Sequence, residues 1–437
     1  MTGVSTATAP TLTTVETTLA GVIGELAPAP LTGGRGRPRI LPAMLLWAGL
    51  VVCVLRGWTS QRALWRLVSA DGLWAFPRVA VTDQAIYRRL AQDGAGVLPE
   101  LFGPLTTALA DRLAPYAATE LAPFAAAVVG LDETTLDPVA RHLPALHGTP
   151  PTACLPGKLA GVFDLRTQLW HHLVVSDAPH QNEKVLARAL VATLPPQSLV
   201  LADLGYFGFA WFDDLTDGGH YWVSRLRAKT SYRLLHVHFQ QGETLDALVW
   251  LGAYKADRAK HAVRLVQYRH GGTLYRYLTN VRDPQQLPLP EVARLYARRW
   301  DIELAVKTVK RELGLHLLWS AKLPVIQAQV WAVLLIAQLW QALRVELAGR
   351  AGVDPFEVSL PLLIQYLPQY AATGRDALTA FLADARRLEF IRPSRRTQIT
   401  APLIPEAAVQ PPPPDLILQR TPRYAQRKCH PHPSSRI

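Results

Sequence analysis

The spacing of hydrophobic and polar positions changes several times along the chain, and each change predicts a different kind of structure. Residues 41–118 have apolar positions at helical spacing, with Ser60 and either Thr82 or Asp83 where helix N-caps are expected. Short apolar runs predict buried strands at 128–131, 158–165, 170–177, 199–202 and 220–226. Helical patterns follow at 182–194, 209–215, 325–347 and 355–390, and alternating β-branched and aromatic runs fill 227–290.

The order of the central elements predicts an α/β fold with a mixed sheet covered by helices on both faces. Three strands come first, followed by a helix, a fourth strand, a helix and a fifth strand. Asp132 directly follows the first of these strands, and Asp203 directly follows the fourth. This order resembles that of a ribonuclease H-like core, in which the first strand lies beside the fourth, so the resemblance implies that the two carboxylates meet. Glu133, Asp137, Asp164 and Asp177 fit turn, cap or opposite-face positions and are read as structural.

Residues 291–314, EVARLYARRWDIELAVKTVKRELG, predict one long helix because they contain no interior Gly or Pro. Tyr296, Arg299, Glu303 and Lys310 fall in one stripe roughly 60° wide at 3.6 residues per turn. An apolar stripe beside it is formed by Leu295, Ile302, Val306, Val309 and Leu313, and Lys307 and Arg311 lie on the far, exposed flank. Helix geometry alone supports a second interpretation equally well. In it, the stripe is an ordinary solvent-facing charged surface with an i,i+4 pair between Glu303 and Lys307.

The composition favours a polyanionic partner. The 437 residues carry a formal charge of +12 and a pI near 9.8, which suits nucleic acid or an acidic membrane surface. Cys53, Cys154 and Cys429 lie far apart, as in proteins of a reducing cytoplasm, and the N-terminus lacks a signal-peptide pattern. Residues 41–55 are too few to span a bilayer and 325–340 are interrupted by Gln, so buried helices and no membrane partner are expected.

The spacing of Tyr296, Arg299, Glu303 and Lys310 resembles the Tyr-Arg-Glu-Lys signature of bacterial insertion-sequence transposases. These are DDE enzymes that cut and paste DNA, and the resemblance covers roughly residues 40–345, including Gly205 and Tyr206 after the second aspartate. It implies a ribonuclease H-like catalytic core with an all-β insertion. In such a core Asp132, Asp203 and Glu303 would be catalytic and would hold two Mg²⁺ or Mn²⁺ ions, for which carboxylate oxygens are suitable ligands. Glu133 after Asp132 and Leu204 after Asp203 depart from the usual pattern, which leaves the subfamily and the hairpin chemistry open.

The resemblance also implies the partners. Tyr296, Arg299 and Lys310 would grip terminal phosphates and a flipped base of double-stranded DNA, with Lys307 and Arg311 beside them. Arg88 and Arg89 lie in the helical region that carries end-specific DNA binding in that family. A homodimer would form the synaptic complex, cleave at terminal inverted repeats through a hairpin intermediate, and join the ends to target DNA. The expected location is the bacterial cytoplasm, in association with the nucleoid.

These observations divide the chain into seven predicted segments. They are a flexible basic arm (1–37), a helical DNA-binding domain (38–120), the first part of the core (121–226), a β-rich insertion (227–290), the second part of the core (291–348), C-terminal helices (349–390) and a disordered basic Pro-rich tail (391–437). A plain helical bundle is the alternative for 38–120. A metal-dependent nuclease without strand transfer and a catalytically silent DNA-binding protein are the alternatives for the whole chain. Cys429, His430 and His432 lack a fourth ligand, so no metal site is expected there.

Overall fold

The architecture comes from a computed structural model. It describes Gly21 and residues 40–74, 76–136, 157–176, 183–253, 257–315, 318–320, 322–371, 376–393 and 400–424. The predicted arm 1–37, apart from Gly21, and the Cys429, His430 and His432 group lie outside the described residues. Two compact units are present. The first unit contains the described residues of Met1–Ala118, Glu133–Gln181 and Asp301–Arg396, and the second those of Thr119–Asp132, Asn182–Trp300 and Thr397–Ile437.

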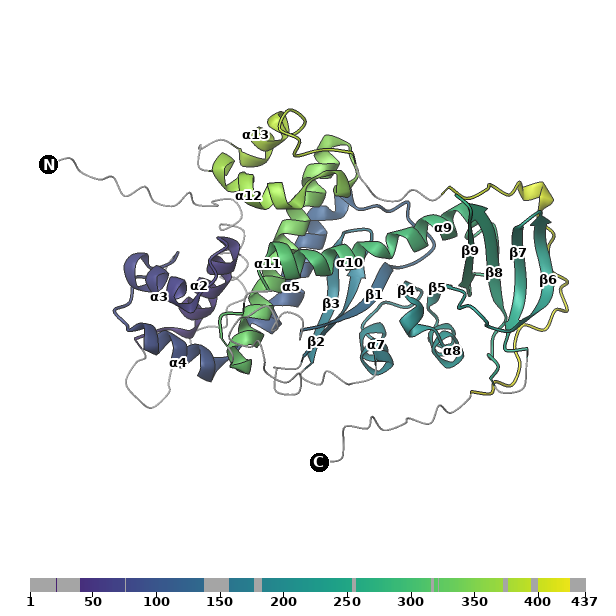
Figure 1. Cartoon of the computed structure of the whole chain (residues 1–437), viewed down its shortest axis with the longest axis horizontal. Helices are drawn as coiled ribbons and strands as arrows, with labels where there is room; N and C mark the ends of the chain where they lie inside the picture. Colours follow the sequence, from purple (N-terminus) through teal and green to yellow (C-terminus); the bar gives the residue numbers. More distant parts are fainter. Residues whose placement is uncertain are drawn as a thin grey trace. The chain divides into compact units, whose positions relative to one another are not determined.

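The fold is mixed α/β, as expected, with one large sheet. Hydrogen bonds connect nine strands in the order β3-β2-β1-β4-β5-β9-β8-β7-β6 (Figure 1). The strands are β1 (Val128–Thr135), β2 (Lys158–Asp164), β3 (Leu169–Ser176), β4 (Leu199–Ala202), β5 (Tyr221–Arg225), β6 (Tyr232–Gln241), β7 (Thr244–Leu251), β8 (Val263–His270) and β9 (Thr273–Thr279). Strands β1, β4 and β5 are parallel, and β2 pairs with β3 antiparallel. The run predicted as β-rich, 227–290, forms β6–β9, and it continues the sheet because β9 pairs with β5.

In the second unit, two helices pack on opposite faces of β5. Trp222 on β5 stacks on Phe212 of α8 (Phe209–Asp217), with ring centroids 4.2 Å apart. Arg225, three residues further on, must point to the other face because side chains alternate along a strand. Its partner on β9, Tyr277, contacts Tyr296 of α9 (Leu289–Arg298) at 5.0 Å between ring centroids. Helix α7 (Glu183–Val191) precedes β4 and joins α8 through an ion pair between Arg188 and Asp214.

The tail prediction was wrong for residues 400–424, here named the C-terminal strap. The strap is part of the second unit. It runs in an extended path along the other segments of that unit and hydrogen-bonds to them. The backbone N–H of Gln410 donates to the carbonyl of His238 on β6 at 2.8 Å, and that of Ala262 donates to Leu418 at 2.9 Å. The imidazoles of His236 and His238 both hydrogen-bond the Gln410 carbonyl. Proline lacks an N–H but has a fixed φ, so a Pro-rich segment pairs at its other residues without losing its extended shape.

The first unit is built around one long apolar helix, α11 (Leu323–Ala351), which packs against helices from both ends of the chain. They are α2 (Ala43–Leu55), α4 (Asp83–Asp93), α5 (Leu98–Leu113), α12 (Leu360–Ala371) and α13 (Ala377–Asp384), with α3 (Gln61–Arg66) beside α2. Ser60 and Thr82 cap α3 and α4 as predicted. By length and composition α11 could cross a bilayer, but 78% of its most apolar window is buried within the protein, as in the core helix of a soluble fold.

Gln338, one of the polar residues that interrupt the apolar pattern of α11, has a clear structural role. Its side-chain amide accepts the N–H of Trp170 on β3 at 2.9 Å and donates to the carbonyl of the same residue at 2.9 Å. It also donates to the Thr106 hydroxyl on α5 at 2.6 Å. Gln338 is fully buried, so these contacts satisfy polar groups that have no access to water.

Replacing Gln338 with Ala is expected to lower the free energy of unfolding by about 2–4 kcal/mol, because two buried backbone groups of Trp170 lose their partner. Urea unfolding measures the change. Gln327→Ala is the matched control, since Gln327 is half-exposed on the same helix and should change stability little. A loss for Gln338→Ala no larger than that of the control would contradict the assigned role.

The prediction of one uninterrupted helix over 291–314 was wrong. Helix α9 ends at Arg298, α10 covers Trp300–Lys307, and a π-helical turn covers Thr308–Glu312. Between α9 and α10, the N–H of Arg299 bonds the Tyr296 carbonyl three residues back. At the second irregularity, the Thr308 hydroxyl bonds the Leu304 carbonyl at 3.0 Å. A hydroxyl that bonds back in this way competes with the helical ladder and bends the helix.

Candidate functional site

The register of β1 and β4 brings the two predicted aspartates to the same place in the second unit. The parallel pairing runs from Val128 opposite Leu199 to Leu131 opposite Ala202, so Asp132 and Asp203 directly follow the last pair. Neighbouring strands lie about 4.8 Å apart, which places the two residues side by side. The prediction that Asp132 ends its strand was wrong, since β1 continues to Thr135. Its parallel pairing nevertheless stops just before Asp132.

Asp203 is held by the turn that follows β4. Its Oδ1 accepts the N–H of Gly205 at 2.8 Å and caps a short 3₁₀ helix, Leu204–Tyr206. Arg227 fixes the same turn, because its guanidinium donates to the Leu204 carbonyl at 2.6 Å and lies 5.0 Å from the Phe207 ring. The capping bond orients the carboxylate and occupies one lone pair of one oxygen. A carboxylate accepts about four hydrogen bonds or metal contacts, so capping and ligation are compatible.

Tyr296 and Arg299, two residues of the signature, lie close to Asp203 in the second unit. Burial raises the pKa of the Tyr296 hydroxyl to about 12; Arg299 and Arg225 lower that pKa, and the negative charge of Asp203 raises it further. The phenol is therefore a neutral hydrogen-bond donor at neutral pH. The Arg299 guanidinium lies 5.8 Å from the Tyr296 ring and 5.7 Å from the Trp300 ring. Trp300 itself is 54% exposed, so an arginine held between two rings borders the site.

Arg225 is a residue of this neighbourhood that the sequence reasoning missed. It ends β5, which pairs with β4 in parallel, and its charge acts on both Tyr296 and Tyr277. The sequence pattern could have identified Arg225, because the carboxyl ends of neighbouring parallel strands lie at one edge of the sheet. A cation at the end of the fifth predicted strand could have been placed beside the two aspartates by that argument.

Glu303 and the other signature cation belong to the first unit. Glu303 lies half-exposed in α10, and its neighbour Asp301 is buried and accepts a hydrogen bond from Gln168 at 3.0 Å. Lys310 donates to the Thr134 hydroxyl and, at 3.1 Å, to the Thr135 carbonyl, both on β1. Thr134 is two residues beyond Asp132 and shares its strand face. Lys310 therefore holds the end of β1 that lies beyond Asp132.

The remaining predicted residues have different surroundings. Glu133 forms an ion pair with Lys158 at 2.6 Å, in line with a structural role. Lys307 and Arg311 are exposed. Arg88 is exposed on α4, whereas Arg89 pairs with Asp93 one turn later at 2.6 Å. Arg88 is therefore the better placed of the two for a partner.

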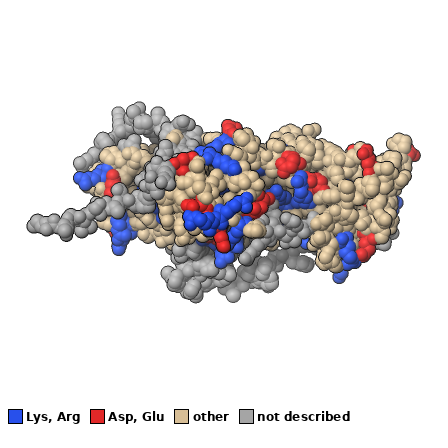
Figure 2. Space-filling model, turned by 90° about the horizontal axis from the view of Figure 1, so that it is seen from above, with Lys and Arg blue, Asp and Glu red and all other residues tan. Residues whose placement is uncertain are grey.

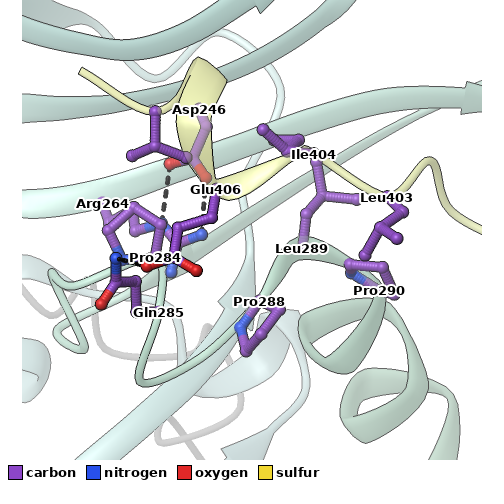
Figure 3. A pocket seen from close by; sticks show the side chains of 11 residues that line it. Asp246, Arg264, Pro284, Gln285, Pro288, Leu289, Pro290, Leu403, Ile404 and Glu406 are labelled. Carbon is purple, nitrogen blue, oxygen red and sulfur yellow. Dashed lines mark hydrogen bonds and ion pairs between the residues drawn. The ribbon is translucent and has the colours of Figure 1, made fainter.

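A pocket of about 250 Å³ lies elsewhere in the second unit, between the strap and the residues that lead into α9 (Figure 3). Its floor carries Arg264 and Asp246, which form a fully buried two-bond ion pair at 2.7 and 2.5 Å. Leu403 and Ile404 of the strap line one side, and Gln285 bonds Glu406 at 2.7 Å. None of the predicted site residues lines this pocket.

On the face seen in Figure 2, Lys and Arg side chains are interspersed with Asp and Glu side chains. Among residues that the structure describes, no group of three or more His, Cys, Asp or Glu side chains is close enough together to hold a metal ion. The β1–β4 register brings two predicted site residues, Asp132 and Asp203, together, and Tyr296 and Arg225 lie near Asp203.

Comparison with known proteins points in the same direction. Residues 153–339 match the family described as "Transposase DDE domain". Over 188 residues the chain is 27% identical to the transposase InsG for insertion sequence element IS4 of Escherichia coli (strain K12), covering 39% of this chain and 41% of that protein. Over 202 residues it is 23% identical to the transposase for insertion sequence element IS231F of Bacillus thuringiensis subsp. israelensis, covering 34% and 42%. The chain thus spans less than half the length of these relatives.

One solved structure is similar in outline, a piggyBac transposase synaptic complex with hairpin DNA. Its TM-score is 0.40 at 10% identity, and the match covers 89% of this chain and 84% of that one. Residues 153–339 are thus similar to a transposase DDE domain, and parts of the chain are similar to two insertion-sequence transposases.

Proposed function

We propose that this chain is a DNA transposase that cleaves DNA at the ends of an insertion sequence and joins those ends to target DNA. The observation that carries the proposal is the β1–β4 register, which sets Asp132 and Asp203 side by side at the ends of two paired parallel strands. Glu303 supplies the third carboxylate by its place in the signature. The parallel trio β1, β4 and β5, with β2 and β3 preceding it, supports a ribonuclease H-like core.

The donor set of the proposed site fits a hard divalent cation. Asp132, Asp203 and Glu303 offer carboxylate oxygens only, which suit Mg²⁺ or Mn²⁺ rather than zinc. When bound, two such ions would activate a water or a 3′-hydroxyl for attack on phosphorus and stabilise the leaving oxygen. No protein nucleophile is then required, so the remaining residues bind and orient the DNA.

The residues around the aspartates are suited to that task. Tyr296 stays protonated at neutral pH and can donate a hydrogen bond to a phosphate oxygen. Arg299 and Lys310 supply charge-assisted donors for phosphates, and Arg225 adds a cation at the same sheet edge. The partner is double-stranded DNA, with a homodimer as the synaptic species, and the setting is a bacterial cytoplasm, in association with the nucleoid.

The test is cleavage of a duplex that carries the element's own ends, with Mg²⁺, for the wild type and for Glu303→Gln. We expect the wild type to cut at the element boundary, and EDTA to abolish cutting. Glu303→Gln should bind the same duplex and fail to cut, because an amide is a poor ligand for a hard cation. Glu312→Gln, at an exposed carboxylate nine residues further on, is the matched control and should retain cleavage.

Three results would change the proposal. Equal cleavage by the wild type and Glu303→Gln would remove Glu303 from the ligand set. Cleavage of the ends without their joining to a target plasmid would indicate that the protein is a metal-dependent nuclease. Binding of the ends without cleavage by any form of the protein would leave a DNA-binding protein.

A further inference from the structure

The C-terminal strap is fastened to the loop between β7 and β8, which contains Arg258. Arg258 and Arg423 exchange backbone hydrogen bonds, at 2.7 Å and 3.0 Å, and the N–H of Arg420 donates to the Lys260 carbonyl at 2.9 Å. Gly252, where the chain leaves β7 towards Arg258, has φ +81°, and a Cβ there would lie 2.0 Å from the Asp257 carbonyl oxygen. Glycine at this turn therefore allows Arg258 to reach the strap.

Arg420 is the anchor of this junction. Its guanidinium donates to the carbonyls of Leu251, Gly252 and Ala259 and lies 4.6 Å from the Trp250 ring. Three hydrogen bonds from Nε and Nη2 are made within the protein, so Arg420 holds the strap in place and adds positive charge. Burial is the largest effect that lowers the pKa of Arg420, and the positive charges of Arg258 and Arg233 lower it further.

Three further arginines surround this anchor and are exposed. Arg258 and Arg423 flank the backbone bridge, and Arg233 on β6 is the register partner of Trp250 on β7. Within the described part of the chain, none of these three guanidinium groups forms an ion pair or a side-chain hydrogen bond. Four arginines, one anchoring and three exposed, are thus gathered on three adjoining segments: β6, the loop after β7 and the strap.

Two carboxylates of this region, Asp213 and Asp217, are already engaged. Asp213 is buried and accepts hydrogen bonds from the Lys260 and His261 N–H groups and from the Tyr424 hydroxyl. Asp217 pairs with the side chains of Lys260 and His261. The excess positive charge of the cluster is therefore not cancelled by these groups, and bringing like charges together costs free energy that a bound anion recovers.

We propose that Arg233, Arg258 and Arg423, held together by Arg420, form a binding surface for DNA backbone phosphates that is separate from the carboxylate site. Planar guanidinium groups bind phosphate oxygens in bidentate fashion, and such contacts position DNA without reading its sequence. The surface deepens the proposed function, since it would hold DNA flanking the reaction site. The strap is a structural part of it, because both Arg423 and the anchor lie there.

The test uses the full chain with a fluorescent random-sequence duplex in EDTA, so that binding is measured without cleavage. The triple variant Arg233→Ala, Arg258→Ala, Arg423→Ala should bind roughly tenfold or more weakly at physiological salt. The slope of log affinity against log salt should fall in magnitude by roughly 2–3, about 0.9 for each lost phosphate contact. Each single variant should lower it by about 1. The corresponding Arg→Lys triple keeps the charge and should retain most of the salt slope.

Arg269→Ala is the matched control, because Arg269 is an exposed arginine of the same unit whose charge is paired with Glu243. It should leave affinity and salt slope unchanged. Thermal unfolding of each variant checks the fold, and the single variants and the Lys triple supply the answer if the Ala triple unfolds. An unchanged salt slope in folded variants would overturn the proposal, as would binding to anionic lipid vesicles in place of DNA.

Failure of this surface and failure of the proposed function give different results. If the wild type binds random duplex, the triple variant does not, and no form cleaves element ends, the surface stands and the transposase activity does not. If the triple variant binds random duplex like the wild type while the wild type cleaves element ends, the reverse holds. With both correct, the triple variant cleaves slowly at limiting protein and at the wild-type rate at saturating protein.

Discussion

Asp203→Asn is expected to reduce cleavage of element-end DNA by about 10³-fold, since a lost metal ligand removes several kcal/mol of charge stabilisation in the transition state. Asn keeps the size of the side chain and the oxygen that accepts the Gly205 N–H. Asn is also as good an N-cap as Asp, so the turn after β4 should be retained. Cleavage rate and DNA affinity, measured on the same preparation, separate chemistry from binding.

Two further variants make this result specific. Asp132→Asn should behave in the same way, because the β1–β4 register makes the two residues equivalent neighbours. Asp213→Asn is unsuitable as a control, because the Asp213 carboxylate holds the strap. Asp164→Asn serves as the control instead, since Asp164 lies in the first unit at the end of β2. Asp164 accepts the Arg166 and Thr167 N–H groups in a turn, and its amide should leave cleavage intact. Substantial cleavage by Asp203→Asn would show that Asp203 only caps a turn.

Asp246→Ala is expected to lower the free energy of unfolding by about 3–5 kcal/mol, because it leaves the fully buried Arg264 guanidinium without its counter-charge. Arg264 retains a hydrogen bond to the Leu287 carbonyl at 2.6 Å, which cannot replace a negative charge. Chemical denaturation followed by tryptophan fluorescence suits the measurement, since Trp250 is buried on the neighbouring segment of β7.

The surface pair Arg269–Glu243 provides the contrast. It is also a two-bond ion pair, but both side chains are about half exposed to solvent. Glu243→Ala should therefore leave the unfolding midpoint close to that of the wild type, because water solvates the remaining charge. Similar losses for Asp246→Ala and Glu243→Ala would show that burial does not determine the cost.

The strands and the aspartate pair could be predicted because they depend on local patterns and one topological rule. The run Leu199–Ala202 is apolar throughout and forms β4 with the predicted bounds. Once the strand order is known, the positions of Asp132 and Asp203 follow from the shared direction of parallel neighbours. Arg225 follows from the same rule.

Other features depend on contacts that a residue pattern does not contain. The irregularity at Arg299 has no Gly or Pro to mark it, and the π turn begins where the Thr308 hydroxyl bonds the Leu304 carbonyl. The strap was read as disordered because it is polar and rich in proline. Its order comes from contacts with residues more than 150 positions away, such as those of Arg420 with Leu251 and Ala259.

The amide of Gln338 and the backbone of Gln410 have a consequence for self-association. Strands β3 and β6 are the two ends of the strand order, where unpaired N–H and C=O groups can recruit a strand from another molecule. Gln338 occupies both backbone groups of Trp170 on β3, and Gln410 occupies the His238 carbonyl on β6. Each exposed ladder is thereby interrupted, which disfavours edge-to-edge aggregation. Self-association by extension of the sheet is therefore disfavoured at both ends of the strand order.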